Sequence, residues 1–541
     1  MRTIGDLYEA YMSEEKNFPD SSYFYGSLPK THLNAVETAL TREKLSFDSN
    51  KMSKLKQILT KHHEKLGLLT PKVASNISQM DNGIILAGQQ ATIFGGVGII
   101  ANKIAAVVNL SDISKEMEKQ LVPMFLVNTH DGVQPEITTI HLPNFQTSAS
   151  KSIISSSSIE GCALNTIRSN DYQWLKNSIN VITNIFNEFK SSISDKSIQK
   201  LFSERVSHIT SFIRETYRSS LTLGEWVTLI WGVQANILND WGVIFFPSSN
   251  PKIRELLFEG YYPFLHSRNE YIKEFNRASA KIESLGFHPT TARKDSNYSP
   301  FFYECPNDGY RVNLRCIEEK DVLTFQGKCP IDKSNYNFSA DKNNLDLSSL
   351  SLYLSPRLDT NQAQLQSILP VYIRVSGPGE MNYNAQVIPA VRKIGIQLPT
   401  YMKYTRVLYN TPWIEKVAKD PQLLQYSLFQ GDFFKHLGTA AKARRKNDIE
   451  LGKDAWSSIT KDILVKKDEL KKVNLAQNNL IEKYKSWQFG MYNVNHHWQE
   501  VSWPWFVMAN VTGLHDYLAS YRRFYSKISR IGGIGYINSN L

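Results

Sequence analysis

The first residues that could do chemistry form a glycine-rich turn between an apolar run and a helical pattern. The run covers residues 83–87, and the helical pattern begins near residue 98. Backbone amides at the start of a helix favour an anion, because this end of the helix carries a partial positive charge. Lys103 lies about one and a half turns into the expected helix and could face the same anion. The turn contains Gly88, Gln89, Gln90, Phe94, Gly95 and Gly96.

The composition of this turn limits its interpretation. The amides of Gln89 and Gln90 both donate and accept hydrogen bonds, which suits a ligand with hydroxyl or carboxylate groups. Neither Gly-x-Gly-x-x-Gly nor Gly-x4-Gly-Lys-Ser/Thr occurs here, so neither a dinucleotide fingerprint nor a phosphate-binding P-loop is predicted. The alternative is a tight turn that only packs.

A histidine and an aspartate follow the next apolar run. His130 and Asp131 come directly after residues 122–129. A histidine in this position can act as a general base or bind phosphate, and the aspartate can orient it or hold an amine. Structural His-Asp pairs are also common, so the pair alone does not establish catalysis.

A second polar turn, at residues 376–380, follows the apolar run 369–375. Gly377 and Pro378 predict a rigid turn at a helix start, with Glu380 in the first helical turn. Glu380 either complements the helix dipole or binds an ammonium group or a sugar hydroxyl. Tyr383 and Gln386 follow at helical spacing and are expected to line the same wall.

The elements that must position these residues form two strand–loop–helix–strand units. The first covers residues 83–127, and the second runs from about residue 369 to 401. Apolar runs that alternate with helical patterns predict a parallel sheet. Ligands of such sheets bind beyond the carboxyl ends of the strands, so the polar turns are expected on one rim.

These segments resemble the bacillithiol biosynthesis cysteine-adding enzymes, the BshC family. The resemblance lies in Gly88-Gln89-Gln90, Phe94-Gly95-Gly96, Lys103 and His130-Asp131, and in a second block, Ser376-Gly377-Pro378-Gly379-Glu380 with Tyr383, Ala385 and Gln386. Order and separation both match. Ser355-Pro356 is also kept, and Gln499-Glu500 resembles the start of the family's Gln-Glu-Arg motif.

The resemblance implies a fold and a reaction. The expected fold is α/β, with a Rossmann-like parallel core similar to class I synthetases, inserted segments and a C-terminal helical coiled-coil domain. The expected reaction joins L-cysteine to the amine of glucosaminyl-malate, with ATP as cofactor, through an aminoacyl-adenylate. The catalytic candidates are His130, Asp131 and Glu380. The substrate-binding candidates are Gln89, Gln90, Phe94, Gly95, Gly96, Lys103, Ser355, Gly377, Pro378, Tyr383 and Gln386, and the nucleotide-binding candidates are Gly88, Gln499 and Glu500.

The chain departs from the family pattern at positions that bear on the substrate. Asn361-Gln362 stand where the family has Arg-Pro, and Val501 stands where it has the arginine of Gln-Glu-Arg. An arginine that clamps a carboxylate or phosphate has no equivalent replacement. Two alternatives therefore stay open: a related ligase with a different amine acceptor, and a non-catalytic binding protein on the same fold.

The remaining segments are assigned by composition and periodicity. The expected organisation is an N-terminal helical segment (1–80), a first Rossmann-like half (81–145), a helical insertion (146–240), a core strand and helix (241–285), a small antiparallel β insertion (286–335), a second Rossmann-like half (350–405) and a helical, coiled-coil domain (412–541). A homodimer through the last domain is one expectation.

Composition narrows the class of protein. The 541 residues carry a formal net charge of +11, which suits either nucleic acid or anionic small substrates. The basic residues are spread along the chain, so small substrates are favoured over nucleic acid. No long apolar run or signal core is evident, and a cytoplasmic protein is expected. None of the four cysteines forms Cys-x-x-Cys, so no metal site is predicted.

Overall fold

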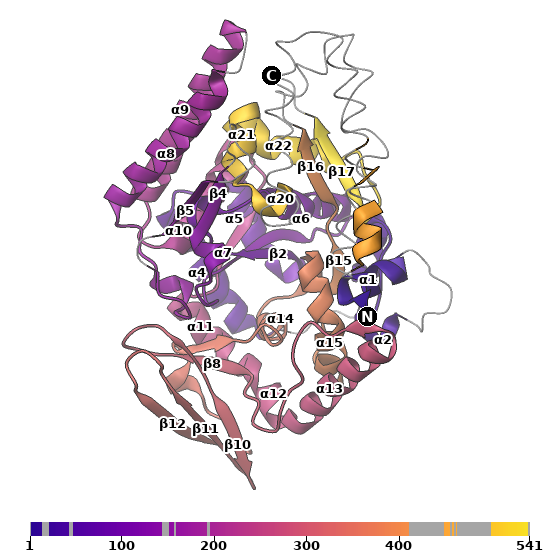
Figure 1. Cartoon of the computed structure of the whole chain (residues 1–541). Helices are drawn as coiled ribbons and strands as arrows, with labels where there is room; N and C mark the ends of the chain where they lie inside the picture. The colour runs from indigo at the N-terminus through magenta and orange to yellow at the C-terminus, as the bar shows by residue number, and fades with distance from the viewer. Residues whose placement is uncertain are drawn as a thin grey trace.

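A five-stranded parallel sheet forms the centre of the molecule (Figure 1). The structure is a computed structural model that describes residues 2–12, 21–42, 47–142, 151–155, 158–191, 195–410, 448–454, 457–458, 461 and 499–538. Across the sheet the strands lie in the order β15 (Thr400–Lys403), β14 (Val371–Ser376), β2 (Ile84–Gln90), β3 (Val122–Asn128) and β6 (Ile244–Pro247). Every neighbouring pair is parallel.

This strand order places the crevice that binds ligands in Rossmann-like folds. The chain builds the sheet outward from β2 through β3 to β6, then crosses back and builds β14 and β15 on the other side. The direction of construction therefore reverses between β2 and β14. A crevice opens at such a switch point, beyond the carboxyl ends of the two strands. The expected Rossmann-like α/β core is confirmed.

The sheet is buried on both faces, which explains the continuous apolar runs of its strands. Alternate residues of β2 and β3 enter two separate cores. One core contains α3 (His32–Leu40), α6 (Ile99–Glu116) and α10 (Leu223–Gly232). The other contains α4 (Ser49–Lys65), α5 (Pro71–Ser78) and α11 (Pro251–Leu257). The result is a three-layer α/β/α arrangement.

The two insertions leave the sheet in different directions. The helical one is an antiparallel pair, α8 (Tyr172–Lys190) and α9 (Lys196–Arg218), which extends away from the sheet in Figure 1. The β insertion has one sheet of β13 (Leu354–Pro356), β8 (Phe301–Glu304) and β9 (Arg311–Asn313), and another of β10 (Arg315–Glu319), β11 (Val322–Lys328) and β12 (Asn335–Asp341). Strand β12 extends beyond residue 335, where the insertion was expected to end.

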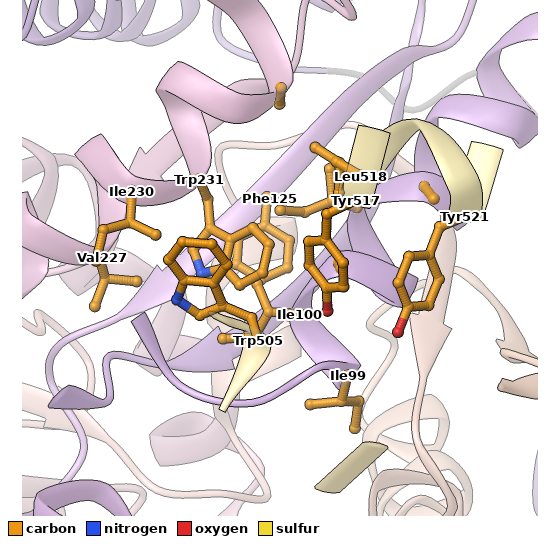
Figure 2. Close-up of a cluster of buried hydrophobic side chains, with 14 of the residues drawn as sticks. Ile99, Ile100, Phe125, Val227, Ile230, Trp231, Trp505, Tyr517, Leu518 and Tyr521 are labelled. Carbon is orange, nitrogen blue, oxygen red and sulfur yellow. The ribbon is translucent and has the colours of Figure 1, made fainter. Parts of the chain in front are cut away.

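The last part of the chain packs into the main core. Helices α21 (Trp505–Thr512) and α22 (Leu514–Tyr525) bring Trp505 and Tyr517 against Trp231 of α10 (Figure 2). The final strand β17 (Ile534–Asn538) pairs in parallel with β16 (Arg406–Asn410). The region expected as a helical, coiled-coil domain (412–541) therefore also contains a strand. The expected coiled coil, at residues 462–487, lies outside the described residues.

The other described elements connect these layers. No helix in the described ranges has the length and apolar character needed to cross a membrane. The elements that connect the layers are β1 (Arg2–Thr3), α1 (Ile4–Met12), α2 (Ser22–Tyr25), α7 (Pro135–Thr138), β4 (Thr139–Leu142), β5 (Lys151–Ile154), the π-helical turn η4 (Val233–Leu238), α12 (Tyr262–His266), α13 (Arg268–Ser284), β7 (Phe287–His288), α14 (Asn361–Gln366), α15 (Pro378–Lys393) and α20 (Gln499–Ser502).

Replacing Gly95 with alanine is expected to destabilise the fold by about 1–3 kcal/mol. An added Cβ would lie 2.9 Å from Cγ2 of Ile230 and 3.0 Å from Nε1 of Trp505, and the backbone φ of +78° disfavours any side chain. The measurement is the free energy of unfolding in denaturant. Gly379→Ala is the matched control, because its Cβ would meet nothing within 4 Å. Equal stability of the two variants would contradict the prediction.

Candidate active site

A buried ionic cluster lies at the crevice between β2 and β14. Lys103 on α6 donates from Nζ to Oε2 of Glu380 at 2.5 Å, and Arg374 on β14 donates from Nη2 to Oε1 of the same carboxylate at 3.1 Å. The Lys103 side chain is 1% exposed and the Glu380 side chain 19%. Lys103 also donates to the backbone oxygen of Gly88 at 2.9 Å and to Oε1 of Gln89 at 3.1 Å. The cluster thus joins the ends of both strands at the switch point.

Electrostatics keep the Glu380 carboxylate ionised. Burial by itself would raise its pKa, but the Lys103 ammonium and the Arg374 guanidinium outweigh burial and hold the pKa below its usual range. The same carboxylate accepts a hydrogen bond from the backbone N–H of Gly377 at 2.6 Å and so closes a capping box at the start of α15. Glu380 therefore caps its helix, and the cationic groups that it binds belong to the protein. Its role toward an ammonium group or hydroxyl of a ligand stays a prediction.

One arm of Arg374 has no partner in the part of the chain that the structure describes. Its Nη1 is buried and makes no hydrogen bond to any described residue. The same holds for the hydroxyl of Ser376, two residues further along β14. An unpaired guanidinium N–H in a buried site is costly unless a ligand satisfies it. Arg374 is therefore the group at this crevice best placed to bind a carboxylate or a phosphate.

A second cluster follows the end of β3. His130 is buried, and burial, reinforced by Arg311 and Arg254, holds its pKa well below the ordinary 6.5. The imidazole is therefore neutral at pH 7, and its Nε2 has no partner among the described residues. The ring borders a small cavity that is also lined by Ser248, Arg254, Tyr261, Ser351 and Gln364.

Asp131 is held beside an arginine of the β insertion. Its Oδ1 lies 3.9 Å from Nη1 of Arg311, and its side chain is 27% exposed. Arg311 also donates to Oγ of Ser355 at 3.3 Å and to the backbone oxygen of Pro356 at 2.8 Å. The Ser355-Pro356 step thus fixes the arginine that faces Asp131. Asp131 does not contact the His130 ring in any described interaction, so the predicted orienting role has no support in this arrangement.

The charges of both clusters act on the hydroxyl of Tyr383. Burial raises the pKa of its hydroxyl, and the negative charges of Glu380 and Asp131 act in the same direction. Both carboxylates are therefore within electrostatic range of one phenol on α15. The expectation that the two polar turns share one rim agrees with this placement.

Gln386 does not line the rim. It is fully buried, and its amide is committed to Thr291 and Ser279: Oε1 accepts from the Thr291 N–H at 2.9 Å and Nε2 donates to the Ser279 hydroxyl at 2.8 Å. Gln386 therefore ties α15 to α13 and to the loop after β7. The prediction that it shares a wall with Glu380 and Tyr383 is wrong, because its face of α15 turns into the protein.

The Phe94-Gly95-Gly96 turn faces the core as well. The Phe94 ring is fully buried against Trp174, Trp226 and Phe506. Trp505 donates from Nε1 to the Phe94 carbonyl at 2.7 Å and Trp231 to the Gly95 carbonyl at 2.8 Å.

The amides of this turn are also occupied. Those of Gly95 and Gly96 donate to the carbonyls of Thr92 and Ile93, and that of Gly98 donates to Trp503. The expectation of free amides for an anion is therefore wrong here. Tight packing accounts for the glycines.

The comparisons with known proteins identify the family. The model described as "Bacillithiol biosynthesis BshC, N-terminal Rossmann-like domain" matches residues 2–404, which include the whole sheet and both clusters. This chain belongs to the BshC family. The predicted resemblance is confirmed.

Relatives within the BshC family are distant. The protein named "Putative cysteine ligase BshC" from Staphylococcus carnosus is 20% identical over 76% of this chain and 71% of its own length. Its namesakes from Carboxydothermus hydrogenoformans and Chlorobium phaeobacteroides are each 22% identical, over 67% and 68% of this chain and 62% and 59% of their own lengths.

The C-terminal segment of this BshC-family chain adds a carboxyl group close to Lys103. Glu500 on α20 is buried and accepts hydrogen bonds from Nδ2 of Asn102 and from the backbone N–H of Val407. Burial raises its pKa to about 8, although these hydrogen bonds and the positive charges of Arg406 and Lys103 each lower the pKa. The structure thus keeps Glu500 mostly protonated at neutral pH. The side chain of Gln499 lies outside the described residues.

The raised pKa of Glu500 predicts a stability that falls as the pH rises. Between its ordinary pKa of 4.5 and about 8, the unfolded chain loses this proton while the folded chain keeps it. The titration of Glu500 therefore lowers the free energy of unfolding by at most about 1.4 kcal/mol per pH unit in this window. Glu500→Gln removes the titration, so the stability difference between variant and wild type should shift in favour of the variant from pH 5.5 to pH 8. Unfolding curves at several pH values measure it, and a constant difference would contradict the prediction.

Sequence reasoning missed the arginines of the BshC site. Arg374 carries a charge in the middle of a buried parallel strand, which is itself a usable signal, because such positions are otherwise apolar. Arg254 lies on α11 and forms a buried ion pair with Glu304 at 2.8 Å. Arg311 comes from the β insertion, and no local pattern could place it next to Asp131.

Proposed function

We propose that this chain is a ligase that joins L-cysteine to the amine of glucosaminyl-malate or a close analogue, with ATP as the source of energy. Membership of the BshC family and relatives named as cysteine ligases support a ligase. The observation that carries the proposal is the ionic cluster of Lys103, Glu380 and Arg374 at the switch point of the sheet. There, a charged ligand would meet an arginine arm that no described residue pairs with.

The proposed reaction proceeds through an acyl-adenylate. A carboxylate oxygen of cysteine attacks the α-phosphorus of ATP, and pyrophosphate leaves. The acceptor amine then attacks the acyl carbon, AMP leaves with the bonding electron pair, and the new amide nitrogen loses a proton. In the first step negative charge shifts from the carboxylate to phosphate oxygens, and in the second it develops on the acyl oxygen and leaves with AMP. Positioned cationic groups therefore lower both barriers.

The residues of the two clusters suit separate parts of this reaction. Arg374 offers to an anionic oxygen the Nη1 that has no partner within the described ranges, while Glu380 and Lys103 fix the guanidinium and the strand ends. His130 is neutral and its Nε2 has no partner among the residues described, so this nitrogen is available to accept the proton of the acceptor amine. Asp131 is partly exposed and can bind the ammonium group of the amino acid.

A ligase with a different amine acceptor is the second candidate. Asn361 and Gln362 of α14 stand in place of the family's Arg-Pro, and their side-chain oxygens are buried without a partner among the described residues. Carbonyl oxygens accept hydrogen bonds, whereas the arginine they replace would bind an acid group. This difference favours an acceptor with fewer acid groups than glucosaminyl-malate.

The test measures ATP cleavage by the full chain in the presence of L-cysteine, with and without glucosaminyl-malate. We expect pyrophosphate release together with a product of the mass of the cysteinyl amide. Pyrophosphate release without that product would favour another acceptor, and a panel of amino sugars would then identify it. Orthophosphate in place of pyrophosphate would contradict the adenylate step. Absence of ATP cleavage with every acceptor would contradict the ligase and favour a non-catalytic binding protein on the same fold.

A further inference from the structure

Two matching turns lie side by side in the β insertion, outside the site described above. Each has the sequence Cys-Pro-x-Asp: Cys305 to Asp308, and Cys329 to Asp332. The first follows β8 directly and the second follows β11 directly, so the turns belong to two different sheets. A pair of Cys-x-x-ligand turns separated by residues 309–328 has the spacing of zinc-ribbon sites, with aspartate in place of the second cysteine.

The backbones of the two turns are alike. The amide of Cys305 donates to the carbonyl of Tyr310 at 2.8 Å, and that of Cys329 donates to the carbonyl of Ser334 at 2.9 Å. In each turn the residue after the aspartate has a left-handed conformation, with φ +74° at Gly309 and +66° at Lys333. The lysine has no intrinsic preference for this conformation, so the turn geometry imposes it.

The four side chains converge on one point. One ligand atom from each of Cys305, Asp308, Cys329 and Asp332 lies within 4.8 Å of the other three. The thiols are paired across the turns: Sγ of Cys305 lies 3.4 Å from Oδ2 of Asp332, and Sγ of Cys329 lies 3.3 Å from Oδ2 of Asp308. In a tetrahedral site with Zn–S near 2.3 Å and Zn–O near 2.0 Å, a sulfur and an oxygen are about 3.5 Å apart.

The surroundings also match those of a metal site. Both cysteines are buried, whereas Asp332 is exposed and provides a path for an ion from solvent. The hydroxyl of Tyr336 donates to Sγ of Cys305 at 3.1 Å, and the amide of Ile331 donates to Sγ of Cys329 at 3.4 Å. Donors aimed at sulfur stabilise thiolates that bind a metal.

We propose that these four side chains bind a zinc ion that joins the two sheets of the β insertion. The two thiolates favour Zn²⁺ over Mg²⁺ and Ca²⁺, which prefer oxygen ligands alone. Four protein ligands fill a tetrahedral shell, so the ion is structural and leaves no position open for a substrate. No step of the proposed ligase reaction depends on it.

The proposed zinc site also helps to position Arg311, the arginine that lies beside Asp131. The turn at Cys305 continues into Gly309, whose carbonyl accepts a hydrogen bond from Ala163 at 2.8 Å, and then into Arg311 beside Asp131. A fixed turn therefore fixes the arginine that faces the rim. We expect loss of zinc to loosen this connection and to lower the thermal stability of the insertion.

The first measurement is the metal content of the full chain, purified without added chelator. Wild type is expected to contain equimolar zinc. Cys305→Ser and Asp332→Asn are expected to contain below about a tenth of an equivalent. Cys316→Ser is the matched control, because Cys316 is a buried thiol on β10 of the same insertion but is not part of the cluster, so its zinc content should equal that of wild type.

A second measurement uses wild type alone and does not depend on the folding of variants. Exchange of the metal for Co²⁺ should produce the visible absorption of tetrahedral cobalt together with a thiolate charge-transfer band, and excess Zn²⁺ should remove both. Chelation should lower the melting temperature, and Zn²⁺ should restore it. Zinc that persists in Cys305→Ser, a cobalt spectrum without thiolate bands, or a Cys305–Cys329 disulfide in the freshly purified chain would overturn the proposal.

Discussion

Replacing Glu380 with glutamine is expected to lower the free energy of unfolding by about 3–5 kcal/mol. The carboxylate is the anionic partner of both Lys103 and Arg374, and the Lys103 side chain is 1% exposed. Without it, the remaining described hydrogen bonds of this buried ammonium group go to the neutral oxygens of Gly88 and Gln89. Denaturant unfolding measures the loss.

A double-mutant cycle separates this effect from a general loss of packing. Lys103→Met removes the buried charge, so Lys103→Met with Glu380→Gln should be more stable than the sum of the single effects by at least about 1 kcal/mol. Glu259→Gln is the matched control, since its partner Lys51 is partly exposed and such pairs contribute about 1 kcal/mol or less. Additive single effects, or a loss no larger than that of Glu259→Gln, would contradict the interpretation.

The same cluster predicts an acid-sensitive fold. The pKa of Glu380 is lowered in the folded state, so its contribution to stability is complete above its ordinary value of 4.5 and is lost as the pH falls through the lower folded value. The slope of stability against pH in this acid range should be smaller in Glu380→Gln than in wild type.

Replacing His130 with asparagine is expected to lower the rate of amide formation by about 10²–10⁴-fold while the protein stays folded. Its Nε2 has no partner among the described residues, so the fold does not depend on it for a hydrogen bond. In the proposed reaction this nitrogen accepts the proton of the acceptor amine. The measurement is kcat for product formation, with ATP–pyrophosphate exchange as a separate assay of the first step, which should be little changed.

The pH dependence gives an independent check on His130. Burial, with Arg311 and Arg254, keeps its pKa well below 6.5, so the base stays unprotonated and its titration should cause no fall in activity near pH 6.5. His63→Asn is the control, because His63 is equally buried but both ring nitrogens are bonded to the backbone, at Leu59 and Phe245. That variant should lose stability and keep its kcat. Equal kcat in His130→Asn and wild type would remove His130 from the reaction.

Local signals were enough to predict the elements of the Rossmann-like core. Residues 84–90 and 122–128 form buried strands, because continuous apolar runs are stable only where both faces of a sheet are covered. The helices at residues 172–218 follow from apolar positions at helical spacing. The family resemblance also rests on local blocks, and it is confirmed.

The same sequence blocks did not show which of their residues face the site and which face the interior. Gln386 and the Phe94-Gly95-Gly96 turn were grouped with the site because they belong to the same segments, yet they face the interior. Helical spacing gives the separation of side chains around an axis, but the neighbouring elements decide which face is covered. The repeated Cys-Pro-x-Asp turn is visible in the sequence, but it lacks the Cys-x-x-Cys spacing on which the sequence prediction of a metal site depends.

The sequence by itself determined the parallel core, its family and the segments that end at its rim, because apolar periodicity and turn residues act over short distances along the chain. Only the tertiary structure decided the strand order, the pairing of Lys103 with Glu380 and Arg374, the approach of Arg311 to Asp131, and the burial of Glu500 near Lys103. These contacts join residues that are far apart in the sequence, and their strength depends on exclusion of water, which only the assembled core provides.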